Sequence, residues 1–342
     1  MSQRPHSPTL ADVARAAGVS TATVSRAINQ PQAVRSVLRD MVLAAVARLA
    51  YVPHAGARAM SLRRSGTVGV VLPTIDNAIF ARGLQAFQQR MVMSGRHVLL
   101  AISDYDAAQE LAQVSNLMAR GVDAVALTGI SQRPELIAKL AQRGLPWVHS
   151  GSFPAPLGSA CVGFRNRAAI AKAVRYLLDM GHRRFAMLAG LMTDNDRATE
   201  RVQGVKASLK SAGLTLPKQA LVQSAYDLQS AREGMRQLLS ANPAPTALLC
   251  GNDVLAYGAL LEAQALGIQV PRQLSVIGFD DLDMSRHWQP GLTTIHVPTE
   301  RMWTLAAEHL IDRLDGTTLV PVQQELDVEL VVRGSTAPAP KA

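Results

Sequence analysis

The sequence predicts an α/β protein whose body has two lobes, each a doubly wound parallel sheet, preceded by an all-α N-terminal segment. Two observations predict this fold class. Short continuous apolar runs alternate with amphipathic stretches along the body of the chain, and repeated strand–helix units form parallel sheets with helices on both faces. The alternation restarts after Ala160, which indicates a second lobe and a cleft at the carboxyl ends of the strands.

The N-terminal segment contains three short amphipathic runs separated by turn signals. A capping-box pattern at Thr9 and Asp12 begins the first run, and Gly18 ends it as a left-handed residue. Ser20 can cap a second helix, which the sequence places at residues 21–29. A third amphipathic run follows. Three short helices with a glycine in the first turn predict a helix-turn-helix headpiece.

Positive charge is concentrated in this part of the chain. Residues 1–64 contain nine Arg, no Lys and two acidic residues, so +7 of the formal net charge of +9 lies there. A small basic unit on a nearly neutral body suggests a polyanion partner. An Arg-rich composition that only aids solubility is the alternative.

The second helix carries the candidate base-reading residues. In a helix-turn-helix unit its N-terminal side chains face the base edges, and a guanidinium can pair with guanine. Hydroxyl groups and helix N-terminal amides suit phosphates. The residues concerned are Thr21, Ala22, Thr23 and Arg26 for bases, and Ser20, Thr23 and Ser25 for phosphates. The alternative is a helical bundle in which the Ser and Thr residues only cap.

The body follows in a regular order of strands and helices. Strands are expected at 67–72, 98–103, 124–127, 147–149, 184–188, 246–250 and 275–278. Helices are expected at 80–94, 107–120, 134–143, 166–180, 198–212, 229–239 and 254–266.

Sequence motifs of enzymes are missing. The chain has no GxxxxGK[ST], GxGxxG, GxSxG, HExxH or CxxC motif, and its eight His form no metal-spaced pair. Asp280, Asp281 and Asp283 can be interpreted as paired carboxylates for glycoside hydrolysis, or more plainly as acceptors for the hydroxyls of a ligand. We therefore expect no enzyme activity, no cofactor and no metal.

Membrane insertion and secretion are not expected either. No apolar stretch approaches about 18 residues, and the N-terminus lacks the apolar block of a secretory signal. The two cysteines cannot form a disulfide framework. The expected location is the bacterial-type cytoplasm, on the nucleoid when the protein is bound to DNA.

The individual residues of the headpiece are more specific evidence for its function than their periodicity. Residues 9–29 read TLADVARAAGVSTATVSRAIN, and Ala50-Tyr51-Val52-Pro53 follows. This wording resembles the LacI/GalR family of bacterial transcription regulators, and the resemblance continues to about Gly334. It implies a headpiece, a hinge helix and a periplasmic-binding-protein-like core in which the chain crosses between the two lobes three times. The implied function is a dimeric repressor of a near-palindromic operator, controlled by a small effector between the lobes.

The resemblance also implies domain bounds. These are a headpiece at 1–53, a hinge and linker at 54–65, a core at 66–334 and a disordered tail at 335–342. Within the core, lobe 1 is expected at about 66–163 and 293–321, and lobe 2 at about 164–292 and 322–334. The tail contains no leucine heptads, which favours a homodimer over a tetramer.

In the family the paired hinge helices push an apolar wedge into the minor groove. Met60 falls on the wedge position by its distance from Tyr51, although an inert linker is the alternative. The full set of expected DNA contacts is Thr9, Ser20, Thr21, Ala22, Thr23, Ser25, Arg26, Asn29, Tyr51, Ala57 and Met60.

The resemblance implies a set of effector contacts in the core. They are polar groups that can bind the hydroxyls of the effector, aromatic rings that can pack on its apolar face, and one arginine of an R-x-x-G motif. The set is Asn77, Phe80, Phe164, Arg201, Tyr226, Asn252 and Asp280, with Asp253 expected to cap a helix. For any single position the alternative is a core aromatic or a helix cap.

Two departures from the family pattern concern charge. Arg165 stands where many relatives have Asp, and Ser150 ends a strand without the Asp of many sugar-binding relatives. The site thus loses acid, which with Arg201 favours a sugar acid. Residues Asn77–Ala81, Val162–Phe164 and Arg301–Met302 resemble those of the gluconate-repressor branch of the family. Arg165 facing solvent would remove part of this argument. A purine corepressor, an architectural DNA-bending protein and a sugar-processing enzyme are the other functions considered.

Overall fold

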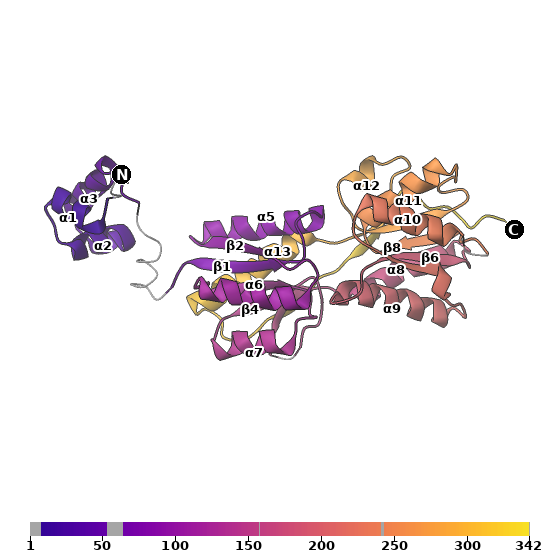
Figure 1. Cartoon of the computed structure of the whole chain (residues 1–342), viewed down its shortest axis with the longest axis horizontal. Coiled ribbons are helices and arrows are strands. Elements are labelled where there is room, and N and C mark those ends of the chain that lie inside the picture. Colours follow the sequence, from indigo (N-terminus) through magenta and orange to yellow (C-terminus); the bar gives the residue numbers. More distant parts are fainter. Residues whose placement is uncertain (1–7, 53–63, 157, 241–242, 342) are drawn as a thin grey trace, which may run out of the picture. The chain divides into compact units, whose positions relative to one another are not determined.

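The structure is a computed structural model that describes residues 8–52, 64–156, 158–240 and 243–341 (Figure 1). The chain divides into two compact units, Met1–Ser65 and Gly66–Ala342.

The first unit is a bundle of three α-helices: α1 (Leu10–Ala17), α2 (Thr21–Asn29) and α3 (Ser36–Arg48), with a 3₁₀ turn at Pro31–Ala33. The predicted capping box is confirmed, because Asp12 N–H donates to the Thr9 hydroxyl and Thr9 N–H donates to Asp12 Oδ2. Gly18 ends α1 with φ 66°. The apolar faces of the helices enclose a small core that includes Val13, Val24 and Val42.

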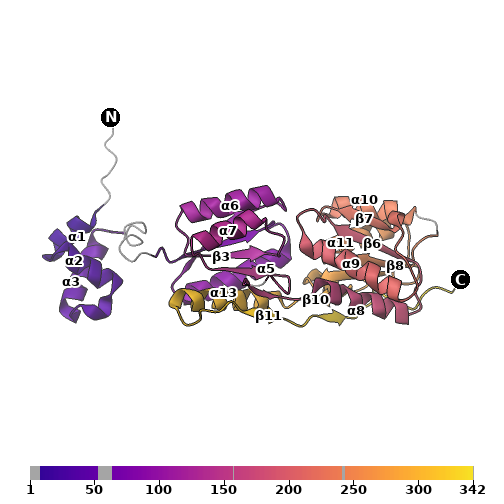
Figure 2. The same cartoon turned by 90° about the horizontal axis from the view of Figure 1, so that it is seen from below.

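Lobe 1 of the second unit is built on a six-stranded sheet of order β11-β5-β4-β3-β1-β2, and all its strand pairs are parallel. Its elements are β1 (Thr67–Leu72), α5 (Ala78–Met93), β2 (His97–Ile102), α6 (Ala107–Ala119), β3 (Ala124–Thr128), α7 (Pro134–Gln142), β4 (Trp147–Ser150), β5 (Ala160–Gly163), α13 (Thr299–Asp315) and β11 (Gln323–Glu325). Helices α6 and α7 cover one face, and α5 and α13 cover the other (Figure 2).

Lobe 2 repeats this plan with a sheet of order β12-β10-β9-β8-β6-β7, in which only β12 is antiparallel. Its elements are α8 (Asn166–Asp179), β6 (Phe185–Gly190), α9 (Asp196–Ser211), a 3₁₀ turn at Lys218–Ala220, β7 (Leu221–Ser224), α10 (Leu228–Leu239), β8 (Ala247–Cys250), α11 (Asp253–Ala265), β9 (Ser275–Asp280), α12 (Met284–His287), β10 (Thr293–His296) and β12 (Glu329–Val331). The predicted fold class is thus confirmed.

Alternation along each strand explains why both sheet faces are covered. In β1, Val68 and Val70 pack beneath α5 and α13, while Val71 packs beneath α6 and α7. In β6, Met187 faces α8 and α9, while Leu188 faces α10 and α11. Strands that bury both faces are apolar at every position, which is why these strands read as continuous apolar runs.

The chain crosses between the lobes three times, after β5, after β10 and after β11. The expected lobe bounds are corrected at two places. Residues 293–296 form β10 and pair with β9 in lobe 2, and residues 323–325 form β11 and pair with β5 in lobe 1. Both strands are held in their sheets by backbone hydrogen bonds. In segments this short, the side-chain pattern gives little indication of such pairing.

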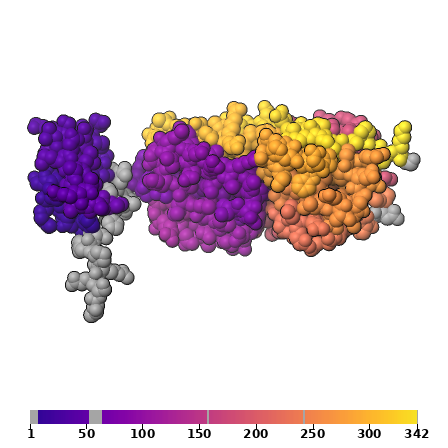
Figure 3. Space-filling model, turned by 90° about the horizontal axis from the view of Figure 1, so that it is seen from above, coloured from indigo at the N-terminus to yellow at the C-terminus, as the bar shows by residue number. Residues whose placement is uncertain are grey.

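The expectation of a disordered tail is wrong for residues 335–339. Ser335 is fully buried; its hydroxyl donates to Val276 O at 2.6 Å and accepts from Thr293 N–H at 2.8 Å. Further along, Ala337 N–H donates to the Ser275 hydroxyl, and Ala339 N–H donates to Met180 O. Figure 3 shows the chain from α13 to the C-terminus running along one edge of both lobes.

Candidate functional site

The start of α2 forms the candidate DNA-reading surface. The Ser20 hydroxyl accepts from Thr23 N–H at 3.2 Å, so it caps the helix as predicted. Among the expected DNA contacts, Thr9, Ser20, Thr21, Ala22 and Arg26 are exposed, and Thr23, Ser25 and Asn29 are half-buried. Ser20 to Thr23 lie at the start of α2, Arg26 and Asn29 lie in its last turn, and Thr9 lies at the start of α1. The exposed members of this set are accessible to a duplex.

Three further expected DNA contacts are Tyr51, Ala57 and Met60. Tyr51 is only 8% exposed and packs in the headpiece core, so its ring is a structural element of the unit rather than an exposed group. Ala57 and Met60 lie outside the described residues, and their expected contacts with the minor groove stay predictions.

In the core, the seven expected effector contacts come together around one cavity between the lobes. Lobe 1 supplies two of them from the start of α5 and one from the end of β5, and lobe 2 supplies the rest from the carboxyl ends of its strands and the following helices. The seven are Asn77, Phe80, Phe164, Arg201, Tyr226, Asn252 and Asp280. The cavity measures about 60 Å³, roughly the volume of two water molecules.

Arg201 is held rigidly in the wall of this cavity. Its Nε donates to Asn166 Oδ1 at 2.9 Å, and one Nη donates to Gly251 O at 2.6 Å. The guanidinium carbon lies 3.6 Å from the centroid of the Phe279 ring. The second Nη lies 4.0 Å from Asp280 Oδ1. The planar group is therefore fixed by three partners and directs one edge toward Asp280.

Asp280 is an unusual carboxyl group. It has φ 107° and is only 6% exposed. Burial raises its pKa to about 7, and the Arg201 charge opposes this rise. The carboxyl group can therefore change protonation near neutral pH, when it can either donate or accept a hydrogen bond.

Asp253 does not cap α11, which corrects the expected role. The cap is Asn252, whose Oδ1 accepts from Leu255 N–H at 2.9 Å. Asp253 is fully buried and accepts from Leu282 N–H, the Ser285 hydroxyl and the Thr294 hydroxyl. Burial raises its pKa to about 6. Its carboxylate thus joins the start of α11 to the loop after β9, to α12 and to β10.

The cavity is also lined by residues outside the expected set, among them Tyr105 and Asn195, which both contact the expected Tyr226. Tyr105 and Tyr226 lie with their ring centroids 5.5 Å apart, and Asn195 Nδ2 donates to the Tyr226 hydroxyl at 3.2 Å. Thr128 and Arg197 also line it, as does the buried Ser150, whose hydroxyl has no hydrogen-bond partner. Most of these residues follow the carboxyl end of a strand, a position that marks candidate ligand contacts in parallel sheets.

Arg165 does not add positive charge to the cavity. It is absent from the lining; its Nε donates to both carboxylate oxygens of Glu325, at 3.1 and 3.2 Å. Its side chain is half exposed. The expectation that Arg165 favours an acidic ligand is therefore wrong, because Glu325 on β11 neutralises its charge.

None of the helices in the described part of the chain is long and apolar enough to span a membrane.

Comparisons with known proteins fit this architecture. Residues 9–54 match the family model "Bacterial regulatory proteins, lacI family", and residues 174–336 match "Periplasmic binding protein-like domain". The HTH-type transcriptional repressor PurR of Pectobacterium carotovorum is 32% identical over 340 residues, which cover 97% of this chain and 98% of that protein.

Two solved structures are similar, one over nearly the whole chain and one over 79% of it. The lac repressor dimer bound to operator and the anti-inducer ONPF has a TM-score of 0.86 at 28% identity, over 97% of this chain and 100% of that one. The transcription regulator GntR from Chromobacterium violaceum has a TM-score of 0.73 at 31% identity, over 79% of this chain and 99% of that one.

These relatives are transcriptional repressors and regulators, in agreement with the expectation that the chain is not an enzyme. The identity and coverage, together with the helix-turn-helix unit and the two-lobed core, decide the assignment. The chain belongs to the lacI family of bacterial regulatory proteins and is a DNA-binding transcriptional repressor with an effector-binding domain.

Proposed function

We propose that the protein is a homodimeric repressor of genes for the use of a sugar acid of the gluconate type, acting in the bacterial cytoplasm. Two headpieces would present two copies of α2 to a near-palindromic operator, since a two-fold dimer matches a two-fold site. The hinge at 54–65, with Ala57 and Met60, is expected to contact the minor groove. The effector would bind between the lobes.

One observation carries the effector proposal, namely that both lobes contribute to one cavity with polar and aromatic walls. Among the described residues that line it are two guanidinium groups, Arg197 and Arg201, and one carboxyl group, Asp280. Asp280 has a pKa of about 7, so it is partly neutral at physiological pH. An anionic ligand therefore meets the guanidinium of Arg201 and an incomplete negative charge on Asp280, which supports an acid over a neutral sugar, while the charge of Arg197 is balanced by Asp196.

The remaining groups suit the rest of a sugar acid. Asn77, Asn252 and Thr128 offer donors and acceptors for hydroxyl groups, and Phe80 and Trp303 offer apolar faces. The unpartnered Ser150 hydroxyl gains a partner when a polar ligand fills the cavity. Because the cavity holds only about two waters, a six-carbon acid requires the lobes to separate before it enters.

A purine corepressor is the second candidate, and the ring pair of Tyr105 and Tyr226 favours it. A flat purine base can stack on such rings, and this contact requires no charge on the ligand.

Isothermal titration of the full-length protein separates the two candidates. The ligands are D-gluconate, its neutral alcohol D-sorbitol, D-glucose, hypoxanthine and guanine. We expect D-gluconate to bind at least about tenfold more tightly than D-sorbitol, the scale of one charged hydrogen bond. Equal binding of acid and alcohol, or tight binding of a purine alone, would reject the sugar-acid proposal.

A further inference from the structure

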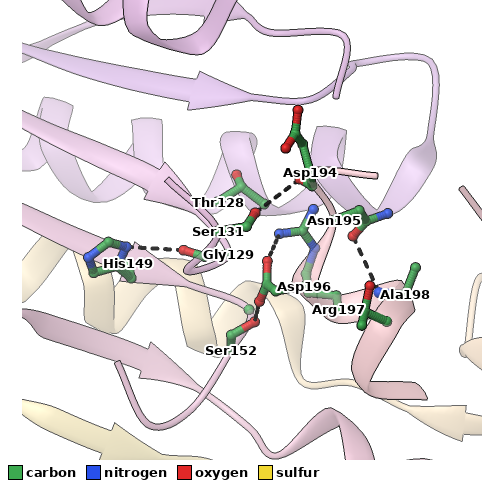
Figure 4. Close-up of polar contacts among 12 residues, drawn as sticks. Thr128, Gly129, Ser131, His149, Ser152, Asp194, Asn195, Asp196, Arg197 and Ala198 are labelled. Carbon is green, nitrogen blue, oxygen red and sulfur yellow. Dashed lines mark hydrogen bonds and ion pairs between the residues drawn. The ribbon is translucent and has the colours of Figure 1, made fainter. Parts of the chain in front are cut away.

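In the segment Asp194–Arg197, at the start of α9 in lobe 2, successive residues contact the effector cavity and lobe 1 in turn (Figure 4). Asn195 and Arg197 line the effector cavity. The two aspartates between and before them contact lobe 1 instead, through residues of the loops after β3 and β4. One four-residue segment thus connects the cavity wall to the opposite lobe.

Asp194 makes two contacts with lobe 1. Its Oδ2 accepts a hydrogen bond at 3.2 Å from Ala107 N–H in the first turn of α6, and its carbonyl oxygen accepts from the Ser131 hydroxyl at 3.0 Å. Asp106 caps the next two amides of α6, so Asp194 takes the amide that this cap leaves. A carboxylate at a helix N-terminus also interacts favourably with the helix dipole.

Asp196 and Arg197 extend the same contact. The Ser152 hydroxyl donates to Asp196 Oδ2, and Asp196 Oδ1 lies 3.2 Å from an Nη of Arg197. The guanidinium of Arg197 lies against Gly129, where a Cβ would be 1.9 Å from this nitrogen. Gly129 is itself held by its carbonyl oxygen, 3.0 Å from His149 Nδ1. Lobe 1 therefore presents a fixed surface on which the segment rests.

We propose that Asp194–Arg197 is a latch between the lobes, in which Asp194 and Asp196 are positioning residues that set the ratio of closed to open core. The reason is geometric. A cavity of about 60 Å³ does not admit a sugar-sized ligand, and separating the lobes at this edge breaks the contacts of Asp194 and Asp196 with lobe 1. The strength of the latch then enters the apparent affinity for any effector, because only the open core admits it.

The latch rests on the proposed function only for its consequence for effector binding. Its existence is tested without a ligand, by single-molecule energy transfer between dyes on the two lobes of the full-length protein. Dyes are attached at Glu135→Cys on α7 and Lys206→Cys on α9, both exposed positions. The native Cys161 and Cys250 are fully buried and do not compete for label.

The variants are Asp194→Ala and Ser152→Ala, each of which removes one contact between the lobes. The matched control is Asp227→Ala. Asp227 also accepts from a helix N-terminal amide, that of Ser230 at 2.8 Å, but inside lobe 2. All three variants lose a hydrogen bond to a carboxylate, so general effects of that loss appear in the control as well.

We expect Asp194→Ala to lower the closed-to-open ratio about five- to tenfold, and Ser152→Ala to change it in the same direction. The control should keep the distance distribution of the parent protein. Ser131→Ala gives a milder test if Asp194→Ala fails to fold. Unchanged distances in all folded latch variants, or an equal change in the control, would overturn the latch. A wrong effector class leaves this measurement untouched, so the two proposals fail separately.

Discussion

Arg201 and Asp280 face each other inside the cavity, with 4.0 Å between the guanidinium nitrogen and Asp280 Oδ1. Both side chains are more than nine-tenths buried. Neither group can be hydrated fully, so each depends on the other and on the ligand that enters. This relationship makes the pair the electrostatic centre of the proposed effector site, and its removal has consequences for binding and for stability.

Replacing Arg201 with Ala should weaken D-gluconate binding by at least about 1.5–3 kcal/mol, the scale of a charged hydrogen bond. The loss for D-sorbitol should be much smaller, because the alcohol carries no charge for the guanidinium to neutralise. Isothermal titration of both ligands with both proteins measures the difference. Arg167→Ala is the control, since Arg167 is an exposed arginine paired with Glu200. Equal losses for acid and alcohol would show that Arg201 reads hydroxyl groups.

The stability of the core should depend on pH through Asp280. Its pKa in the folded protein is about 7, above the ordinary value of 3.8, so the folded state holds the proton more tightly than the unfolded state. The free energy of unfolding should therefore fall as pH rises from about 4 to about 7, by at most about 4 kcal/mol from this group. Asp253, with a pKa of about 6, contributes in the same direction.

Urea unfolding at about pH 5 and about pH 8 tests this dependence. Asp280→Asn removes the titrating group, so its loss of stability between the two pH values should be smaller than that of the parent protein. Parallel curves for the two proteins would contradict the raised pKa of Asp280.

Much of the cavity could be predicted because its residues follow readable local signals. Asn77 and Asn252 cap the helices that follow β1 and β8, and Asp280 ends β9. Arg197 could not be selected in this way, since its position depends on Gly129, far away along the chain. The same holds for Arg165, which is neutralised by Glu325 at a separation of 160 residues. Local sequence patterns place a residue at the end of a strand. Long-range contacts then decide whether its side chain lines the cavity or pairs with a residue elsewhere.

The elements beyond residue 278 also differ in how well the sequence indicates them. The apolar spacing of Met302, Ala306 and Leu310 is readable in the sequence, so α13 was open to prediction. The strands β10, β11 and β12 have three or four residues each, and β11 and β12 are partly exposed sheet edges. Backbone pairing selects such strands, and their composition gives little sign of it.

Arg26→Ala should weaken operator binding by about 1–3 kcal/mol and relax the preference at one base pair in each half-site. The exposed position of Arg26 on α2 suits a base contact. Competition binding with operator and random duplexes measures both effects. Arg15→Ala, an exposed arginine on α1 paired with Asp12, should leave base preference unchanged. An equal loss on both duplexes for Arg26→Ala would identify a phosphate contact instead.

Ser335→Ala should lower the free energy of unfolding by about 1–3 kcal/mol, because Val276 O and Thr293 N–H both lose their bonds to a buried hydroxyl. Urea unfolding of the full-length protein measures this change. Replacement of the exposed Lys341 with Ala should change stability by less than about 0.5 kcal/mol. A similarly small effect for Ser335→Ala would show that the Ser335 hydroxyl does not anchor this segment to the fold.

Gly129→Ala should affect the core at two levels. Gly129 has φ 75°, where a side chain costs about 1–2 kcal/mol, and its Cβ would lie 1.9 Å from an Nη of Arg197 and 2.3 Å from Asp196 Oδ1. Gly144→Ala is the matched control, with φ 61° and open space around its Cβ. Both variants should lose stability in urea unfolding, but only Gly129→Ala should displace Arg197 and weaken D-gluconate binding. Equal ligand affinity in the two variants would show that the position of Arg197 does not matter for the effector.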